Sequence, residues 1–276
     1  MINELFSNQF TYFVLLMIPT AAIAGFFAGF FGIGGGIITV PFLFYIFNNF
    51  GIDQNYLMHL AVGTSFSIII PTAIVSVYTH YKHEAVDLNI VKGYGPFVIC
   101  GVIIGTTTAA TLQTKSLIIF FSIVLYFLSI NFFFQREDSK KRINFNLIAK
   151  SVSGLIVGFI SSLTGIGGAI LNVPILKLCG YSINRAIGSA AAIGFFISIF
   201  GALGFIISGS YLNVNLPLSL GFINIPAFLI FIPITTFMAR IGAKLLHKID
   251  RNKINKLFGI FLLIAASKLV YDYFQF

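Results

Sequence analysis

The sequence predicts an all-α polytopic membrane protein made of two inverted repeats of about five helical segments each, eight to ten segments in all. Composition, the length of the apolar segments and an internal repeat predict it. Of 276 residues, 58% are hydrophobic and 9% charged, with a mean hydropathy of +0.97. Soluble domains average about 45–50% apolar and about 25% charged residues. The composition therefore excludes a soluble domain, a disordered tail and a nucleic-acid-binding module, so we expect a lipid bilayer and no nucleic acid as surroundings.

Ten apolar segments follow one another along the chain, most of them near the 20 residues that cross about 30 Å of hydrocarbon. The first half contains Phe10–Phe31, Ile37–Phe50, Leu57–Thr79, Gly93–Leu112 and Ser116–Phe134. The second half contains Leu147–Thr164, Ala169–Tyr181, Ala186–Ser208, Leu216–Met238 and Ile254–Phe274. The second segment of each half is shorter and follows a glycine cluster, which predicts a shallow hairpin or a broken helix beginning a short half-helix.

An internal repeat divides the chain into two halves. Gly25–Leu43 reads GFFAGFFGIGGGIITVPFL and Gly158–Leu176 reads GFISSLTGIGGAILNVPIL, with 10 of 19 positions identical at an offset of 133 residues. Ala61–Thr64 (AVGT) and Ala186–Ser189 (AIGS) form a weaker echo. We therefore predict a first transmembrane repeat over 1–134, a cytoplasmic linker over 135–146 and a second transmembrane repeat over 147–276.

Basic residues predict how the halves lie in the membrane. Equivalent loops of the two halves differ in their number of basic residues. Lys82 and Lys92 follow the third segment, whereas the counterpart loop, 209–215, has no Lys or Arg. With both termini outside and the linker inside, 15 of the 17 basic residues face the cytoplasm, as the positive-inside rule favours. The exceptions are Lys115 and Lys268. The halves are thus predicted to be inverted, as in secondary transporters.

The two glycine clusters predict an anion site. Irregular backbone at membrane depth must be buried in protein or line a cavity. A half-helix that starts there directs unpaired N–H groups and its positive dipole end at that point. The alternative is that these glycines only let helices pack closely. The candidate substrate-binding residues are Gly34, Gly35, Gly36, Ile37, Thr39, Thr64, Ser65, Gly167, Gly168, Ala169, Asn172 and Ser189, with Pro41 and Pro174 shaping the half-helices.

Several of these candidates have a second interpretation. Serine and threonine hydroxyls in helices often bond to their own backbone. His80, at the cytoplasmic end of the third segment, is a candidate for proton coupling or a structural interfacial histidine. Lys177 and Arg185 either anchor the second short segment at the membrane surface or draw anions toward it.

The sequence lacks the residues that other classes of membrane protein need. None of the eight acidic residues lies mid-span, which argues against a cation substrate and a carboxylate relay. An intramembrane protease would need a buried Ser–His pair or two mid-membrane aspartates; His59 is the nearest exception and has no evident nucleophile beside it. Neither glycine cluster ends in Gly-Lys-Ser/Thr, so no P-loop is present. We expect no enzyme activity, no cofactor and no metal.

The chain resembles the sulfite exporter TauE/SafE family, also called the toluenesulfonate uptake permease family. The twinned GIGGG…VP and GIGG…VP repeats carry the resemblance, which covers essentially the whole chain. The Gly63-Thr64-Ser65 triplet, the stretch from His80 to Val86-Asp87, and Gly242 with Leu257-Phe258-Gly259 also fit. The resemblance implies a multi-pass transporter of the bacterial inner membrane for sulfur-containing anions such as sulfite, sulfoacetate or other organosulfonates. Ala169 departs from the repeat, since the first copy has Gly36 there, so the two hairpins are unequal.

The leading hypothesis is a secondary transporter that moves a small sulfur oxyanion by alternating access, as exporter or importer. The alternatives are a passive anion channel and a transporter of a non-sulfur organic anion. Abundant small residues would also allow packing between protomers, which leaves a homo-oligomer open.

Overall fold

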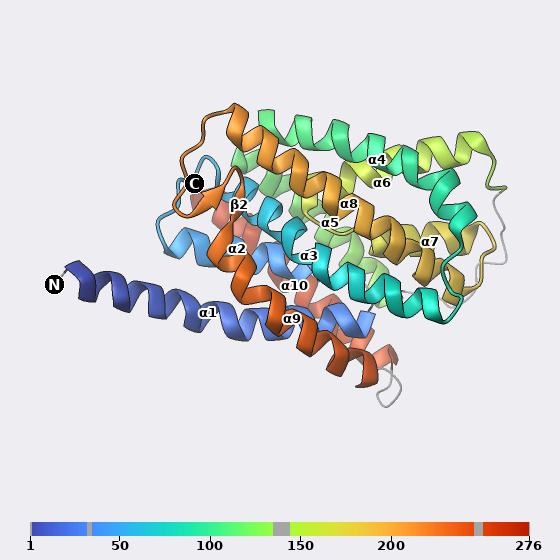
Figure 1. Cartoon of the computed structure of the whole chain (residues 1–276), viewed down its shortest axis with the longest axis horizontal. Helices are drawn as coiled ribbons and strands as arrows, with labels where there is room; N and C mark the ends of the chain where they lie inside the picture. The colour runs from blue at the N-terminus through green and yellow to red at the C-terminus, as the bar shows by residue number, and fades with distance from the viewer. Residues whose placement is uncertain (1, 32–34, 135–143, 246–250, 276) are drawn as a thin grey trace.

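The computed structural model describes residues 2–31, 35–134, 144–245 and 251–275 (Figure 1). The first half contains α1 (Ile2–Phe31), α2 (Gly36–Asn49), α3 (Leu57–Lys82), α4 (Leu88–Thr111) and α5 (Thr114–Phe134). The second contains α6 (Leu147–Thr164), α7 (Ala169–Leu178), α8 (Ile183–Tyr211), β1 (Ser219–Leu220), β2 (Ile223–Asn224), α9 (Ile225–Leu245) and α10 (Arg251–Gln275). Position 34, one of the candidate residues, lies outside the described residues.

Two short helices stand among the long ones, as the sequence predicts. Eight helices of the described chain are long and apolar enough to cross a membrane, and α2 and α7 are shorter apolar helices of 14 and 10 residues. Each short helix comes second in its half. The protein is therefore an all-α polytopic membrane protein, which confirms the predicted fold class.

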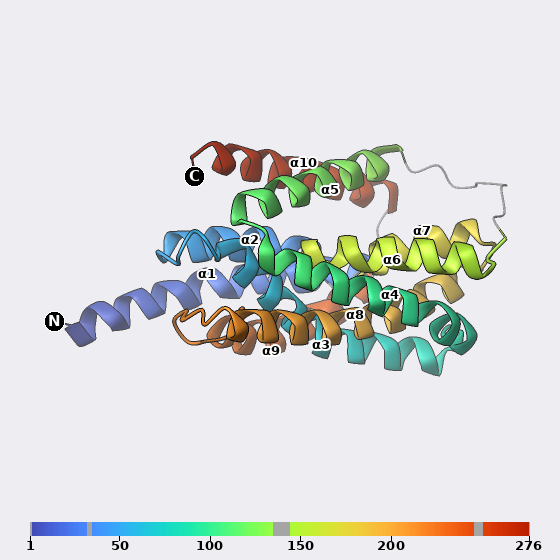
Figure 2. The ribbon, with the colours of Figure 1, turned by 90° about the horizontal axis from the view of Figure 1, so that it is seen from above.

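Helices of one half pack on helices of the other half, in equivalent pairs. Helix α1 packs along α9, and its counterpart α6 packs along α4, while α3 packs on α8 and α5 on α10. Figure 2 shows α5 and α10 together as a layer to one side of the other helices. Helices α1 and α6 begin toward opposite ends of the molecule (Figure 1). This pairing is the one that two related halves in opposite orientation would give, and the inversion across a membrane stays a prediction.

Side-chain caps decide where two helices begin. The Asp87 carboxylate accepts hydrogen bonds from the N–H groups of Asn89 and Ile90, which starts α4 at Leu88, five residues before the apolar segment predicted from Gly93. The Asn146 side chain accepts from the N–H of Ala149 and starts α6 at Leu147, as predicted. Capping groups satisfy N–H groups that a helix start leaves without intrahelical partners.

One predicted segment is shorter than its hydropathy suggests. The sequence predicts a segment from Leu216, but α9 begins only at Ile225 because β1 and β2 form an antiparallel hairpin before it. Leu218 and Gly221 have φ values of 49° and 55°, which a right-handed helix cannot contain. The side chain of Asn224 then accepts from the N–H of Ala227 at 3.0 Å and caps α9.

Glycines allow the long helices to touch backbone to backbone. A Cβ atom on Gly158 would stand 2.0 Å from the carbonyl oxygen of Val98, and one on Gly29 would stand 1.9 Å from that of Ala239. The first contact joins α6 to α4 and the second joins α1 to α9. Small residues at these crossings permit the close approach that stabilises helices in a membrane.

We predict that Gly158→Ala destabilises the protein, because the added methyl group forces α6 away from α4. Overpacking of this kind costs about 1–3 kcal/mol. Gly95→Ala, inside the partner helix α4, is the control, since nothing lies within 4 Å of a Cβ atom there. Thermal unfolding of the detergent-purified proteins measures both, and equal melting temperatures for the two variants would contradict the proposed contact.

Candidate functional site

The two glycine loops meet, backbone to backbone. A Cβ atom on Gly36, the first residue of α2, would stand only 2.2 Å from the carbonyl oxygen of Gly165, which follows α6. Gly165 has a φ of 65°, and a Cβ atom there would stand 2.8 Å from Cγ2 of Val40. The loop between α6 and α7 therefore lies directly on the first turns of α2.

The two short helices begin in the same way. Gly35 and Gly168 precede α2 and α7 with φ, ψ of 78°, −12° and 72°, −15°. Each carbonyl accepts the N–H groups three and four residues ahead. Neither start has a side-chain cap, so the N–H groups at the first two positions point out of the helix without an intrahelical acceptor. Pro41 and Pro174 stand at the sixth position of the two helices, as the repeat predicts.

The central helices α3 and α8 hold the second loop. The Ser65 hydroxyl, on α3, donates to the carbonyl oxygen of Gly165 at 3.0 Å. On α8, Gly194 lies against the carbonyl of Gly167, since a Cβ atom on Gly194 would stand 2.4 Å from that oxygen. Ile69 of α3 lies beside both loops, within 3.1 Å of Cβ positions on Gly36 and Gly167. Ser65 is thus the predicted hydroxyl that the fold brings to the loop crossing.

Three other predicted polar residues are bonded to backbone. Thr39 is buried, and its hydroxyl donates to the carbonyl of Gly35, four residues back in its own helix. The hydroxyl of Thr64 accepts from the N–H of Asn224 at 2.9 Å, and that of Ser189 accepts from the N–H of Asp87 at 3.0 Å. The structure does not bring the hydroxyls of Thr64 and Ser189 to the crossing; they hold loops.

These two loop contacts are equivalent. Thr64 and its neighbour Gly63 hold the β-hairpin before α9, because a Cβ atom on Gly63 would stand 2.2 Å from the carbonyl oxygen of Phe222. Ser189 and its neighbour Gly188 hold the loop between α3 and α4, where the corresponding distance is 2.4 Å to the carbonyl oxygen of Ala85. The weak echo of the sequence therefore marks one Gly-hydroxyl pair in each half, which we call the latches.

Asn172 differs from the other predicted polar residues because part of its side chain has no hydrogen-bond partner. Its side chain is fully buried, Oδ1 accepts from the Tyr94 hydroxyl at 3.0 Å, and Nδ2 has no hydrogen-bond partner. The fully buried Ser161 hydroxyl, on α6, has no partner either. Ile37 and Ala169, the first-turn residues on either side, are buried and apolar.

Sequence reasoning missed Ser161 and Tyr94. A signal for Ser161 was available in the repeat, because the offset of 133 aligns it with Ala28 in the first half. Tyr94 carried no local signal, since it comes from α4 and reaches Asn172 only through the tertiary fold.

The end of the bundle where α3 ends and α8 begins carries the other predicted groups. His80 lies in the last turn of α3, and its carbonyl accepts from the N–H of Ala85. Lys177 lies in the last turn of α7, and Arg185 is exposed in the first turn of α8. Burial, with Asp87 and Cys179 nearby, raises the pKa of the Tyr181 hydroxyl above its ordinary value. These residues lie away from the contacts of the loop crossing.

A buried histidine occupies the start of α3. The His59 ring packs against Phe222, its Nε2–H donates to the carbonyl of Ala109 at 2.9 Å, and Nδ1 has no partner. Its hydrogen-bond partner is backbone, as a structural histidine requires. Among the described residues, no three His, Cys, Asp or Glu side chains gather in a way that could hold a metal ion.

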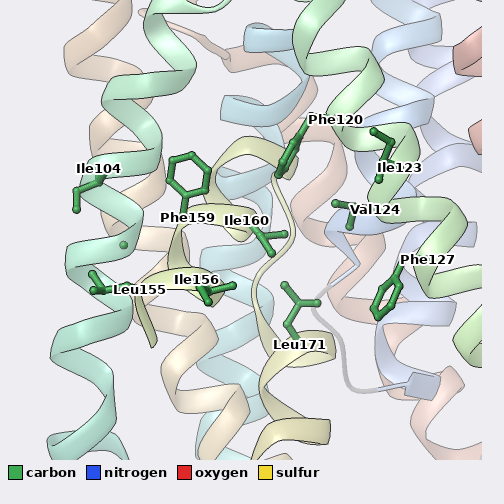
Figure 3. Close-up of a pocket in the computed structure, with 11 residues that line it drawn as sticks. Ile104, Phe120, Ile123, Val124, Phe127, Leu155, Ile156, Phe159, Ile160 and Leu171 are labelled. Carbon is green, nitrogen blue, oxygen red and sulfur yellow. The ribbon is translucent and has the colours of Figure 1, made fainter. Parts of the chain in front are cut away.

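A large cavity next to the first turn of α7 has an entirely apolar lining. It has a volume of about 690 Å³ and lies between α5 on one side and α4, α6 and α7 on the other (Figure 3). Phe120 and Phe127 of α5 and Phe159 of α6 are among its lining, and every lining residue is apolar or glycine. Since an anion needs hydrogen-bond donors, this cavity is unsuited to one.

Comparison with known proteins gives the family. The model of the sulfite exporter TauE/SafE family matches residues 17–269. The chain belongs to this family. A probable membrane transporter protein of Haemophilus influenzae is 34% identical over 263 residues, covering 93% of this chain and 98% of the relative. Similarly named proteins of Methanocaldococcus jannaschii (27%, covering 86% and 89%) and Bacillus subtilis (YunE; 25%, covering 94% and 98%) also match. No solved structure matches the chain.

These comparisons confirm the resemblance found in the sequence. The TauE/SafE match and the relatives' names indicate a membrane transporter rather than an enzyme. A transporter implies a small-molecule substrate and a membrane setting, and both agree with the long apolar helices.

We predict that Gly36→Ala is poorly tolerated although alanine stands at the equivalent position 169. The added methyl group would collide with the carbonyl of Gly165 and separate the loops, at a cost of about 1–3 kcal/mol. The reciprocal variant Ala169→Gly is the control, and it should lose no more than about 1 kcal/mol through backbone entropy. Thermal unfolding measures the difference, and a Gly36→Ala protein as stable as Ala169→Gly would refute the contact.

Proposed function

We propose that the protein is a secondary transporter of small sulfur-containing anions, such as sulfite or organosulfonates, that works by alternating access in the bacterial inner membrane. The family supports the substrate class, since its description names sulfite export. The observation that carries the proposal is the crossing of the two glycine loops, where α2 and α7 both begin without side-chain caps. Helix starts of this kind favour negative charge.

The proposed site uses backbone donors. The N–H groups of 35–37 and 167–170 would face the anion, and Asn172 would add a side-chain contact at the start of α7, while Ser65 would hold the second loop through the carbonyl of Gly165. Pro41 and Pro174 cannot donate hydrogen bonds to the carbonyls of Ile37 and Ile170, which frees the first turn of each half-helix to adjust. The site needs no cofactor, because binding and release of a small anion involve no bond making.

The latches support the alternating step. The Gly63–Thr64 latch holds the hairpin between α8 and α9 on the start of α3, and the Gly188–Ser189 latch holds the α3–α4 loop on the start of α8. We infer that the hairpin closes the outer face and the α3–α4 loop the inner face, with both termini outside and the linker inside. Opening one latch while the other stays closed would expose the crossing to one side at a time.

Counterflow tests the proposed function directly. In proteoliposomes that contain the purified protein, we expect uptake of isotope-labelled sulfite or methanesulfonate to accelerate when unlabelled anion fills the lumen. A carrier returns faster when loaded, whereas a passive channel gains nothing from the opposite side. Labelled acetate is the comparison for a non-sulfur organic anion. Uptake without acceleration would establish the channel, and acceleration by acetate alone would replace the substrate class.

The latches predict opposite effects on access. Thr64→Val leaves the N–H of Asn224 without its acceptor, and Ser189→Ala does the same to Asp87. Each loss should raise opening at its own face about fivefold, the factor that a hydrogen bond of about 1 kcal/mol sets. The reporter is a cysteine replacing Ile69, with Cys100 and Cys179 changed to serine, labelled by an impermeant thiol reagent added to either side.

We expect Thr64→Val to accelerate labelling from outside and Ser189→Ala from inside. The matched controls are Ser67→Ala on α3 and Ser198→Ala on α8, whose hydroxyls donate within their own helices to Thr64 and Phe195 carbonyls. Acceleration from the same side in both variants would contradict the assignment of the two loops to opposite faces.

A further inference from the structure

The two glycine loops differ in the side chains that surround them. From the Cβ position on Gly168, Nδ2 of Asn172 is 3.2 Å away and Oγ of Ser161 is 3.4 Å away. From the Cβ position on Gly35, the nearest described atoms are the methyl group of Ala28 at 3.1 Å and the carbonyl oxygen of Ala24 at 3.3 Å. The δ1 methyl group of Ile197 also lies 2.2 Å from the Gly168 position, and at the α2 start the Ser65 hydroxyl lies 3.1 Å from a Cβ position on Gly36. The two starts differ in how their polar groups are bonded, because the Ser65 hydroxyl already donates to the carbonyl oxygen of Gly165.

The polar groups at the α7 start are unsatisfied. Ser161 Oγ and Asn172 Nδ2 are fully buried and have no hydrogen-bond partner. Thr39, which the repeat aligns with Asn172, bonds to the Gly35 carbonyl instead. Leaving a buried donor unpaired costs about 1–3 kcal/mol. Two such groups converging on one uncapped helix start, of a ten-residue helix, indicate a ligand that satisfies them.

Tyr94 fixes the orientation of the Asn172 amide. Its hydroxyl donates to Oδ1 at 3.0 Å, which leaves Nδ2, 3.2 Å from the Cβ position on Gly168, as the free end of the amide. The Tyr94 ring is fully buried, and its centroid lies 5.4 Å from that of Phe145. Tyr94 contacts the amide and not the helix start, so it acts as a positioning residue.

The absence of charged side chains around the α7 start, among the described residues, bears on the charge of the ligand. Among the described buried side chains, Asp272 is the only Asp, Glu, Lys or Arg, and it pairs with Lys268 on α10. The groups described around the α7 start are therefore uncharged: an amide, a hydroxyl, backbone N–H groups and the methyl group of Ile197. Neutral donors in a buried site can replace the hydration of one negative charge much better than that of two, because the energy of hydration rises with the square of the charge.

We propose that the anion site is asymmetric, with Ser161 and Asn172 of the second half as its side-chain donors and Tyr94 as the positioning residue, and that it takes a singly charged oxyanion in preference to a dianion. This inference rests on the proposed function and names the substrate class of the same loop crossing. The first loop then supports the second sterically, through Gly36, and contributes no side-chain donor.

Binding of methanesulfonate, a singly charged probe, tests the site in the full-length protein in detergent. Ser161→Ala and Asn172→Ala should each weaken binding about tenfold, since each removes a hydrogen bond to a charged ligand. Ser162→Ala is the matched control: it lies one residue further along α6, is equally buried, and donates to the carbonyl of Phe159. It should stay within about twofold of the wild type. Sulfate should bind about tenfold more weakly than methanesulfonate to the wild type.

Two further readouts separate binding from folding. Ser161→Ala should not lower the melting temperature of the ligand-free protein, because the hydroxyl that it removes has no partner. Tyr94→Phe should weaken methanesulfonate binding, and the Tyr94→Phe, Asn172→Ala double variant should bind no more weakly than Asn172→Ala alone. A tyrosine that only packs in the core would add its own loss in the double variant.

The outcomes distinguish the two proposals. Transport by the wild type with unchanged binding in Ser161→Ala and Asn172→Ala would overturn the asymmetric site and leave the proposed function intact. A loss of binding confined to Thr39→Val would also overturn the asymmetric site, because it would place the site on the first loop. Tighter binding of sulfate than of methanesulfonate would overturn it too. Failure of the wild type to bind or exchange any of these anions would overturn the proposed function together with the inference.

Discussion

The contact between Gly36 and Gly165 is the constraint on which the rest of the structure depends. With a Cβ position 2.2 Å from a carbonyl oxygen, it leaves no room for any side chain. It places the start of α2 against the loop that precedes α7, from opposite halves of the chain. Because both helix starts are uncapped, the crossing concentrates unpaired N–H groups within the protein. A broken backbone at membrane depth is stable only where protein surrounds it, as α3 and α8 do here.

The helix pairs around the crossing follow from the same use of glycine. Carbonyl oxygens of Val98 and Ala239 lie where Cβ atoms of Gly158 and Gly29 would otherwise stand. Lipid tails are as apolar as leucine, so helices in a bilayer gain little from burying large side chains against each other and more from close packing. The same reasoning explains why the Gly63 and Gly188 latches can hold loops tightly on α3 and α8.

The sequence predicted the fold well because hydropathy and repetition report on it directly. The ten segments, the two short helices and the starts of α6 and α7 agree with the structure. The start of α9 was wrong because hydropathy cannot register the positive φ of Leu218 or a two-residue strand pair. The candidate site was predicted less well, since residue type alone cannot tell a free hydroxyl from a bonded one. Thr39, Thr64 and Ser189 are all bonded to backbone, while Ser161 went unnoticed.

The sequence by itself determined the membrane class, the repeated motif and the glycine loops that begin the half-helices. It could do so because each depends on residues close together in the chain: apolar runs, a repeated motif and glycines that accept φ values near 70°. Only the tertiary structure decided which polar groups are left without partners. Tyr94 reaches Asn172 across 78 positions, and Ser65 reaches Gly165 across 100. Contacts between residues so far apart arise from helix packing, so the difference between the two loops becomes visible only in the folded protein.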